Sequence, residues 1–151
     1  MIEQFFQEIE NKNISIKKVK VGELSKEIIQ FLENRNIEVY TKEIYLTTKG
    51  LIHLSRDNKK KRGAGLTKEE IINIPNILKN PKIIIFDNEK SKLNLLYCKN
   101  RNICNEFIKI VIDTKSYEKK LGKLTLVKTA GIIQEYNLKD KFYEVLEMEG
   151  R

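Results

Sequence analysis

From residue 83 to residue 130 the chain is a succession of short apolar runs, and this pattern restricts the fold more than any other feature of the sequence. The runs span residues 83–86, 93–98, 107–113 and 124–130, and they are rich in Ile, Leu and Val. Asn, Asp, Lys or Gly separates them, as turn residues separate the strands of a sheet. Four strands in such close succession predict an antiparallel meander.

Segments with the spacing of helices come mostly before this region. Apolar residues recur every three or four positions over residues 2–10, 24–34, 49–57, 67–78 and 136–148. Thr67 and Glu70 have the spacing of a capping box, and Pro75 is expected to shorten or kink the helix that follows. Residues 14–21 and 38–46 are expected to be extended. The order of elements predicts an α+β fold, with N-terminal helices packed on a four-stranded antiparallel meander sheet and a C-terminal helix.

The length and composition of the chain predict one globular domain. A chain of 151 residues with 40% hydrophobic and 33% charged residues can bury a core of its own. We expect residues 1–17 to form a helical extension and residues 18–147 to form the core. The apolar runs are too short to span a membrane, and two cysteines fit a reduced chain, so a cytoplasmic location is expected. Metal-ligand spacing and glycine-rich nucleotide motifs are absent from the sequence, so no metal or cofactor is expected.

The net charge of +8 and the pI near 9.4 allow two interpretations. Basic proteins bind nucleic acids because their cations neutralise phosphates. The sequence is also crowded with Lys, Asn and Ile, a bias that AT-rich coding produces without any function. Charge alone does not decide between a functional basic face and a surface that is merely rich in lysine.

The only histidine of the chain, His53, is the first candidate for chemistry. On a helix over residues 49–57, Lys49 four positions before it and Arg56 three positions after it lie on a neighbouring face. Cations beside a histidine disfavour its protonated form, so such a histidine can accept a proton near neutral pH. This set suits metal-independent RNA cleavage, in which a base removes the proton of a ribose 2′-OH and cations stabilise the phosphate transition state. The structural alternative is a histidine that borders the core and bonds a backbone carbonyl.

Further basic residues could bind a nucleic acid. Lys128 and Thr129 end the fourth predicted strand, where a hydroxyl and an ammonium can meet a phosphate, and Lys109 and Lys115 flank the third. A hydrophilic loop adds four consecutive cations, Lys59, Lys60, Lys61 and Arg62. Each of these residues also has the simpler interpretation of solvated surface or an ordinary strand end.

Several of these pieces together resemble a known family. A strand entering Leu46-Thr-Thr is followed by Ile52-His53-Leu54 on a helix, a basic loop, a helix over residues 66–78, Asn80-Pro81, a meander and Val127-Lys128-Thr129. This order resembles the phage-associated branch of the barnase–EndoU–colicin–RelE-like nucleases over residues 18–146. The resemblance implies RNA cleavage without a metal. It also implies that His53 is the acid/base or phosphate-binding residue and Thr129 the polar residue of the last strand, with Lys128 and Arg56 as weaker transfers.

The sequence departs from the family at one point and so leaves alternatives open. Many relatives have a second histidine a few residues after the first, whereas this chain has Arg56-Asp-Asn-Lys-Lys there. Arg56 or Lys59 could supply the missing cation. Alternatively, the chain has lost catalysis and is a module that binds nucleic acid or an acidic protein through residues 59–62. A third interpretation is an interaction protein whose charge reflects codon bias alone. The expected partners are RNA and a neutralising antitoxin or phage protein.

Overall fold

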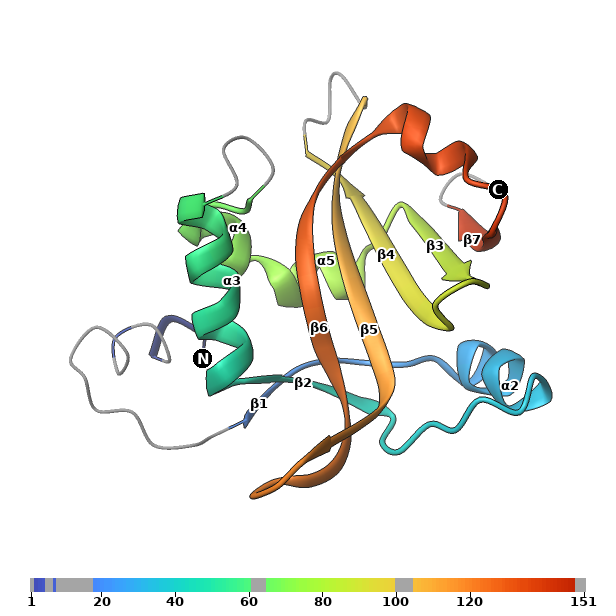
Figure 1. The fold of residues 1–151 in the computed structure, drawn as a ribbon, viewed down its shortest axis with the longest axis horizontal. Coiled ribbons are helices and arrows are strands. Elements are labelled where there is room, and N and C mark those ends of the chain that lie inside the picture. Colours follow the sequence, from blue (N-terminus) through green and yellow to red (C-terminus); the bar gives the residue numbers. More distant parts are fainter. Residues whose placement is uncertain (1, 5–6, 8–17, 61–64, 100–104, 149–151) are drawn as a thin grey trace.

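The computed structural model describes residues 2–4, 7, 18–60, 65–99 and 105–148, without the side chains of residues 56–60 and 148. These residues form a seven-stranded sheet in the order β1-β2-β6-β5-β4-β3-β7 (Figure 1). The strands are β1 (Lys18–Glu23), β2 (Glu43–Thr47), β3 (Ile83–Asp87), β4 (Lys92–Cys98), β5 (Glu106–Glu118), β6 (Gly122–Gln134) and β7 (Tyr143–Met148). The helices are α2 (Lys26–Asn34), α3 (Thr48–Lys60), α4 (Lys68–Ile72), α5 (Ile74–Lys79) and the 3-10 helix η1 (Glu135–Lys139). Most of the helix predicted over residues 2–10 lies outside the described residues.

The predicted four-stranded antiparallel meander under N-terminal helices is wrong in the size and the pairing of the sheet. β3, β4, β5 and β6 do pair in sequence order, each antiparallel to the next. The error lies before residue 48, where the expected extended segments join the sheet as β1 and β2. β1 pairs antiparallel with β2, and β2 pairs in parallel with β6, which makes the sheet mixed. A strand's period indicates which face is buried but not which distant strand lies beside it.

The predicted C-terminal helix over residues 136–148 is also wrong. The short helix η1 is followed by β7, which pairs antiparallel with β3 at the edge of the sheet. Every residue of β3 is buried. An uncovered edge there would leave buried backbone N–H and C=O groups without partners. The pairing of β7 satisfies those groups, and this tertiary gain outweighs the weak helical spacing of the segment.

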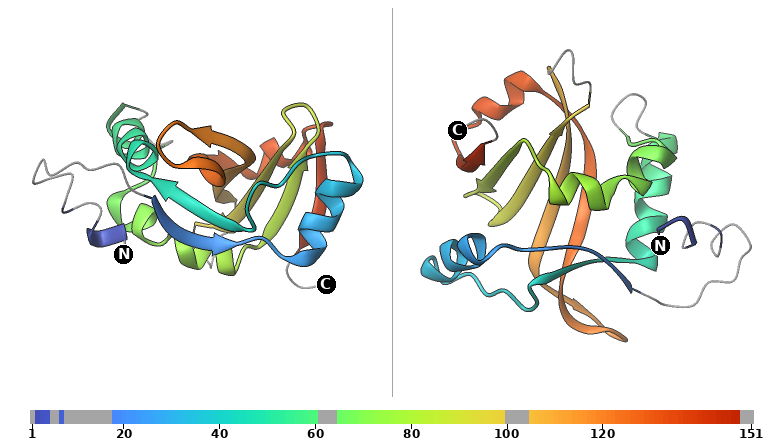
Figure 2. Two further views of the ribbon diagram at one scale, coloured as in Figure 1. Left: turned by 90° about the horizontal axis from the view of Figure 1, so that it is seen from below. Right: turned by 180° about the vertical axis from the view of Figure 1, so that it is seen from behind.

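Helices α4 and α5 lie across one face of the sheet (Figure 2, right). Ile71 and Ile77 are fully buried in the main core that these helices share with the sheet. The predicted capping box is confirmed: the Thr67 hydroxyl accepts the Glu70 N–H at 3.2 Å, and the Glu70 carboxylate accepts the Thr67 N–H at 2.8 Å. Pro75 falls in the first turn of α5, so the single predicted helix is divided into two.

The expected cytoplasmic setting rests on short apolar runs and on two reduced cysteines. No helix in the described part of the chain is long and apolar enough to cross a membrane. Cys98, at the end of β4, is disulfide-bonded. This finding corrects the expectation that both thiols are reduced.

Candidate functional site

Helix α3 carries the only histidine and starts directly where β2 ends. The Thr47 hydroxyl accepts the Gly50 N–H at 3.0 Å, which satisfies one of the N–H groups left open at the start of a helix. Leu51 and Leu54 are buried in the main core, as their spacing predicts. His53 lies on the exposed side of the same helix. The buried leucines therefore fix the rotation of α3 and turn the imidazole outward.

At Gly50, helix α3 lies against β6. A Cβ atom on Gly50 would stand 3.2 Å from the Thr47 Oγ1 atom and 3.9 Å from the Val127 carbonyl oxygen. Figure 1 shows α3 beside β6 along the middle of that strand. The close approach brings the first turns of α3 next to the residues that follow Val127.

A β-bulge interrupts β6 at that point. Val111 of β5 lies opposite Thr129, while the next residue, Ile112, lies opposite Val127. Lys128 is therefore the extra residue of the bulge, without a partner of its own in the register. Bulges bend a strand and re-aim its side chains, and they are frequent next to active sites. Lys128 is exposed here, although it lies in a strand whose residues 124–127 are all buried.

These elements enclose a cleft of about 720 Å³ between α3, β5 and β6. Five residues singled out in the sequence line it together, namely Lys49, His53, Lys115, Lys128 and Thr129. They come from α3, β5 and β6, and α3 lies far from the two strands in the chain. The cleft therefore joins an imidazole, three lysine side chains and a hydroxyl around one space.

The other cations singled out in the sequence do not extend this set in the described structure. Arg56, Lys59 and Lys60 lie on α3 beyond His53, but their side chains are not described. Lys61 and Arg62 fall outside the described residues. Lys109 lies in the middle of β5 and does not line the cleft.

The surroundings of Lys109 differ from those of the cleft. By strand alternation its side chain shares a face of β5 with Phe107, a member of a second, smaller core cluster. Burial lowers the pKa of Lys109, and the charge of Lys90 lowers it further. This environment disfavours the charged ammonium that would bind a phosphate.

Sequence reasoning missed the contribution of the far end of β5. Asp113, Tyr117 and Glu118 line the cleft, together with Lys115. The Asp113 carboxylate accepts the Lys115 N–H at 3.0 Å and lies 3.8 Å from the Lys92 ammonium. The apolar run ends near residue 113, so the sequence indicated a shorter strand. The polar residues up to Glu118 continue the strand because they pair with β6. This pairing cannot be recognised from the residues of the segment itself.

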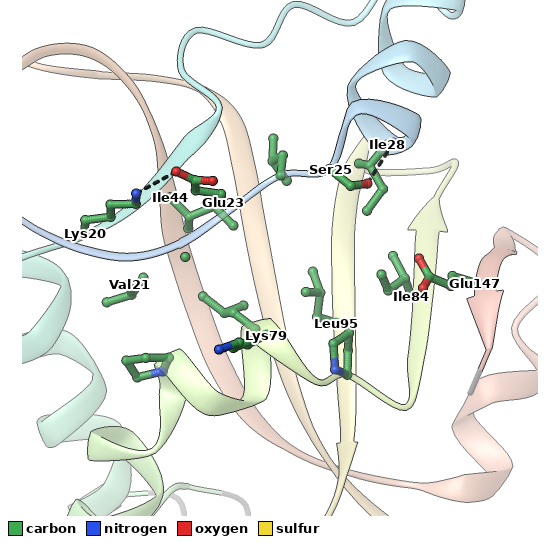
Figure 3. A pocket seen from close by; sticks show the side chains of 15 residues that line it. Lys20, Val21, Glu23, Ser25, Ile28, Ile44, Lys79, Ile84, Leu95 and Glu147 are labelled. Atoms are coloured by element: carbon green, nitrogen blue, oxygen red, sulfur yellow. Dashed lines mark hydrogen bonds and ion pairs between the residues drawn. The ribbon is translucent and has the colours of Figure 1, made fainter. Parts of the chain in front are cut away.

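A second pocket of about 710 Å³ lies on another part of the molecule, between β1, α5 and the start of α2 (Figure 3). Its floor is apolar, with Ile44, Ile84 and Leu95. On its rim, Lys20 and Glu23 are bonded to each other at 2.6 Å, which raises the pKa of Lys20 and lowers that of Glu23. The described lining of this pocket includes no imidazole, and one of its two lysines, Lys20, is paired with Glu23. The cleft beside His53 is therefore the better candidate for phosphate chemistry.

Within the described residues, no three His, Cys, Asp or Glu side chains gather where they could hold a metal ion. A family model described as phage-Barnase-EndoU-ColicinE5/D-RelE like nuclease3 matches residues 18–133, which is most of the chain. The chain belongs to this nuclease family, and the resemblance found in the sequence is confirmed. Membership indicates nucleic acid as the class of substrate. No curated protein and no solved structure matches the chain.

Proposed function

We propose that the chain is a metal-independent endoribonuclease of phage or mobile-element origin. The observation that carries this proposal is the shared cleft: the only histidine stands with Lys49, Lys128 and Thr129 in a member of a nuclease family. An imidazole and fixed cations are the groups that cleavage through a ribose 2′-OH requires. The family description supports the proposed origin.

The proposed reaction forms a bond between the 2′ oxygen and the adjacent phosphorus and breaks the bond from phosphorus to the 5′ oxygen. The phosphate gains negative charge on the way. We assign the stabilisation of that charge to Lys128 and Arg56, and the hydrogen bond to the phosphate to Thr129. We assign binding of the neighbouring nucleotides to Lys49 and the basic residues 59–62.

Two protons move in this reaction. One leaves the 2′-OH, and one reaches the departing 5′ oxygen. His53 is assigned to one of these transfers. The carboxylate of Glu118 lines the same cleft and is the proposed group for the other.

The proposal predicts that pure protein in excess EDTA cleaves single-stranded RNA of mixed sequence and leaves DNA of the same sequence intact. RNA is cleaved because it carries the attacking 2′-OH, which DNA lacks. Gel analysis of end-labelled strands measures both reactions. Equal cleavage of the two strands would contradict 2′-OH attack. Binding of RNA without cleavage would favour the alternative of a non-catalytic binding module.

A further inference from the structure

A two-stranded arm borders the cleft beside His53. β4 pairs with β5 only as far as Ile112, and β2 pairs with β6 only at Thr125 and Leu126. Residues 113–124 of β5, the turn and β6 therefore pair only with each other in the described sheet, and we call them the β5–β6 arm. Figure 1 shows this arm extending past β2. One side of the arm, residues 113 and 115–118, forms a wall of the cleft.

Tyr117 on this arm is an unusually exposed aromatic residue. It is 67% exposed, and only Tyr136 among the large apolar side chains of the described chain is more exposed, at 69%. Among the described residues, the Tyr117 ring contacts no other ring and its hydroxyl has no hydrogen-bond partner. The ring therefore adds nothing to the core. It is either an ordinary surface residue or a contact for a ligand.

The charges around Tyr117 indicate the chemistry of such a ligand. All four lysines of the arm, Lys115, Lys119, Lys120 and Lys123, are exposed. Lys49 of α3 and Lys128 of β6 line the same cleft. An exposed aromatic ring among cations is the arrangement with which proteins bind single-stranded nucleic acids, because the ring stacks on a base while the cations follow the phosphates.

We propose that Tyr117 is a stacking platform for an unpaired base next to the scissile phosphate, and that it makes the site selective for single-stranded over double-stranded RNA. This inference rests on the proposed function, since it places the phosphate in the cleft beside His53. A base inside a duplex is already stacked between its neighbours and cannot reach a protein ring. The phosphates of a duplex could still contact the lysines, but the duplex would gain no stacking energy from Tyr117.

The test measures binding rather than cleavage, so that it does not depend on catalysis. The probe is a fluorescent single-stranded oligonucleotide with 2′-O-methyl riboses, which cannot be cleaved by 2′-OH attack, together with the duplex that it forms with its complement. Fluorescence anisotropy gives the dissociation constants for the native protein, Tyr117→Ala, Tyr117→Phe and Tyr136→Ala. The Tyr136 variant removes an equally exposed tyrosine that does not line the cleft.

The expected result is a loss of single-strand affinity of roughly 5- to 100-fold in Tyr117→Ala, the range measured when an aromatic base-stacking residue is removed. Tyr117→Phe should bind like the native protein because it keeps the ring, and Tyr136→Ala should also be unchanged. Duplex affinity should be the same in all four proteins.

Three outcomes would overturn the inference: native affinity in Tyr117→Ala, an equal loss for single strand and duplex, or no binding of the single strand by native protein. The proposed function fails separately. If the native protein cleaves no RNA but Tyr117→Ala loses only single-strand affinity, the stacking site stands and the ribonuclease proposal does not. If the native protein cleaves RNA and Tyr117→Ala binds the single strand with native affinity, the ribonuclease proposal stands and the stacking site does not.

Discussion

Replacing His53 by Ala should reduce the rate of RNA cleavage by about 10²- to 10⁴-fold, the contribution of a positioned acid or base. The chain has no other imidazole that could take over the proton transfer. The fold should survive, because His53 is exposed while Leu51 and Leu54 hold α3 on the core. Initial rates on single-stranded RNA and thermal unfolding curves of the two proteins measure both expectations.

A chemical control separates lost catalysis from altered structure. The variant leaves an open space in an exposed cleft, so imidazole added to the buffer should restore part of its activity. Imidazole should have no such effect on the native protein. A variant that cleaves at the native rate would move the active site away from His53 or point to a contaminating ribonuclease.

Replacing Lys128 by Ala should reduce kcat by about 10²- to 10³-fold, as the loss of one fixed donor to a transition-state anion does. Lys128 owes its exposure to the bulge between Val127 and Thr129, which sets it in a wall of the cleft. Because the charge on the phosphate grows only during the reaction, kcat and kcat/KM should fall together. Steady-state kinetics on a short RNA measure both parameters.

Two matched variants make this prediction specific. Lys128→Arg keeps the positive charge and should retain much more activity than Lys128→Ala. Lys79→Ala removes an exposed lysine that lines the other pocket and should cleave like the native protein. A fall in activity of the same size in the Lys79 variant would mean that overall charge, rather than the place of Lys128, determines the rate.

The parts of the fold that follow from local pattern were predictable from the sequence. The Thr67–Glu70 capping box, the interruption at Pro75 and the helix that carries His53 all depend on residues within one or two turns of each other. The strands β3, β4, β5 and β6 also followed from short apolar runs between turn residues. In each case the determining contacts are close in the sequence.

The remainder depends on contacts between distant segments. β2 and β6 lie side by side although Ile44 and Thr125 are far apart in the chain, and β7 forms because β3 needs a partner at its edge. Neither pairing can be recognised from the sequence of the strand that takes part in it. For this reason the sheet was expected to be smaller and purely antiparallel, and β7 was expected to be a helix.

The same distinction applies to the candidate site. His53, Lys128 and Thr129 were singled out by residue type and by position at the end of an element. Their convergence depends on the packing of α3 against β6 and on the bulge at Lys128, which are properties of the folded chain. Tyr117 and Glu118 had no local signal, because the polar end of β5 is a strand only through its pairing with β6.

The measurement that tests the central claim most directly is the chemical identity of the new ends produced from RNA in EDTA. Attack by the 2′-OH links the 2′ oxygen to the phosphate, so the first products should carry a 2′,3′-cyclic phosphate on one fragment and a 5′-hydroxyl on the other. Mass spectrometry of the early products distinguishes these ends from all others. A 3′-hydroxyl with a 5′-phosphate would mean that water attacks the phosphate, and would contradict the mechanism proposed for this cleft.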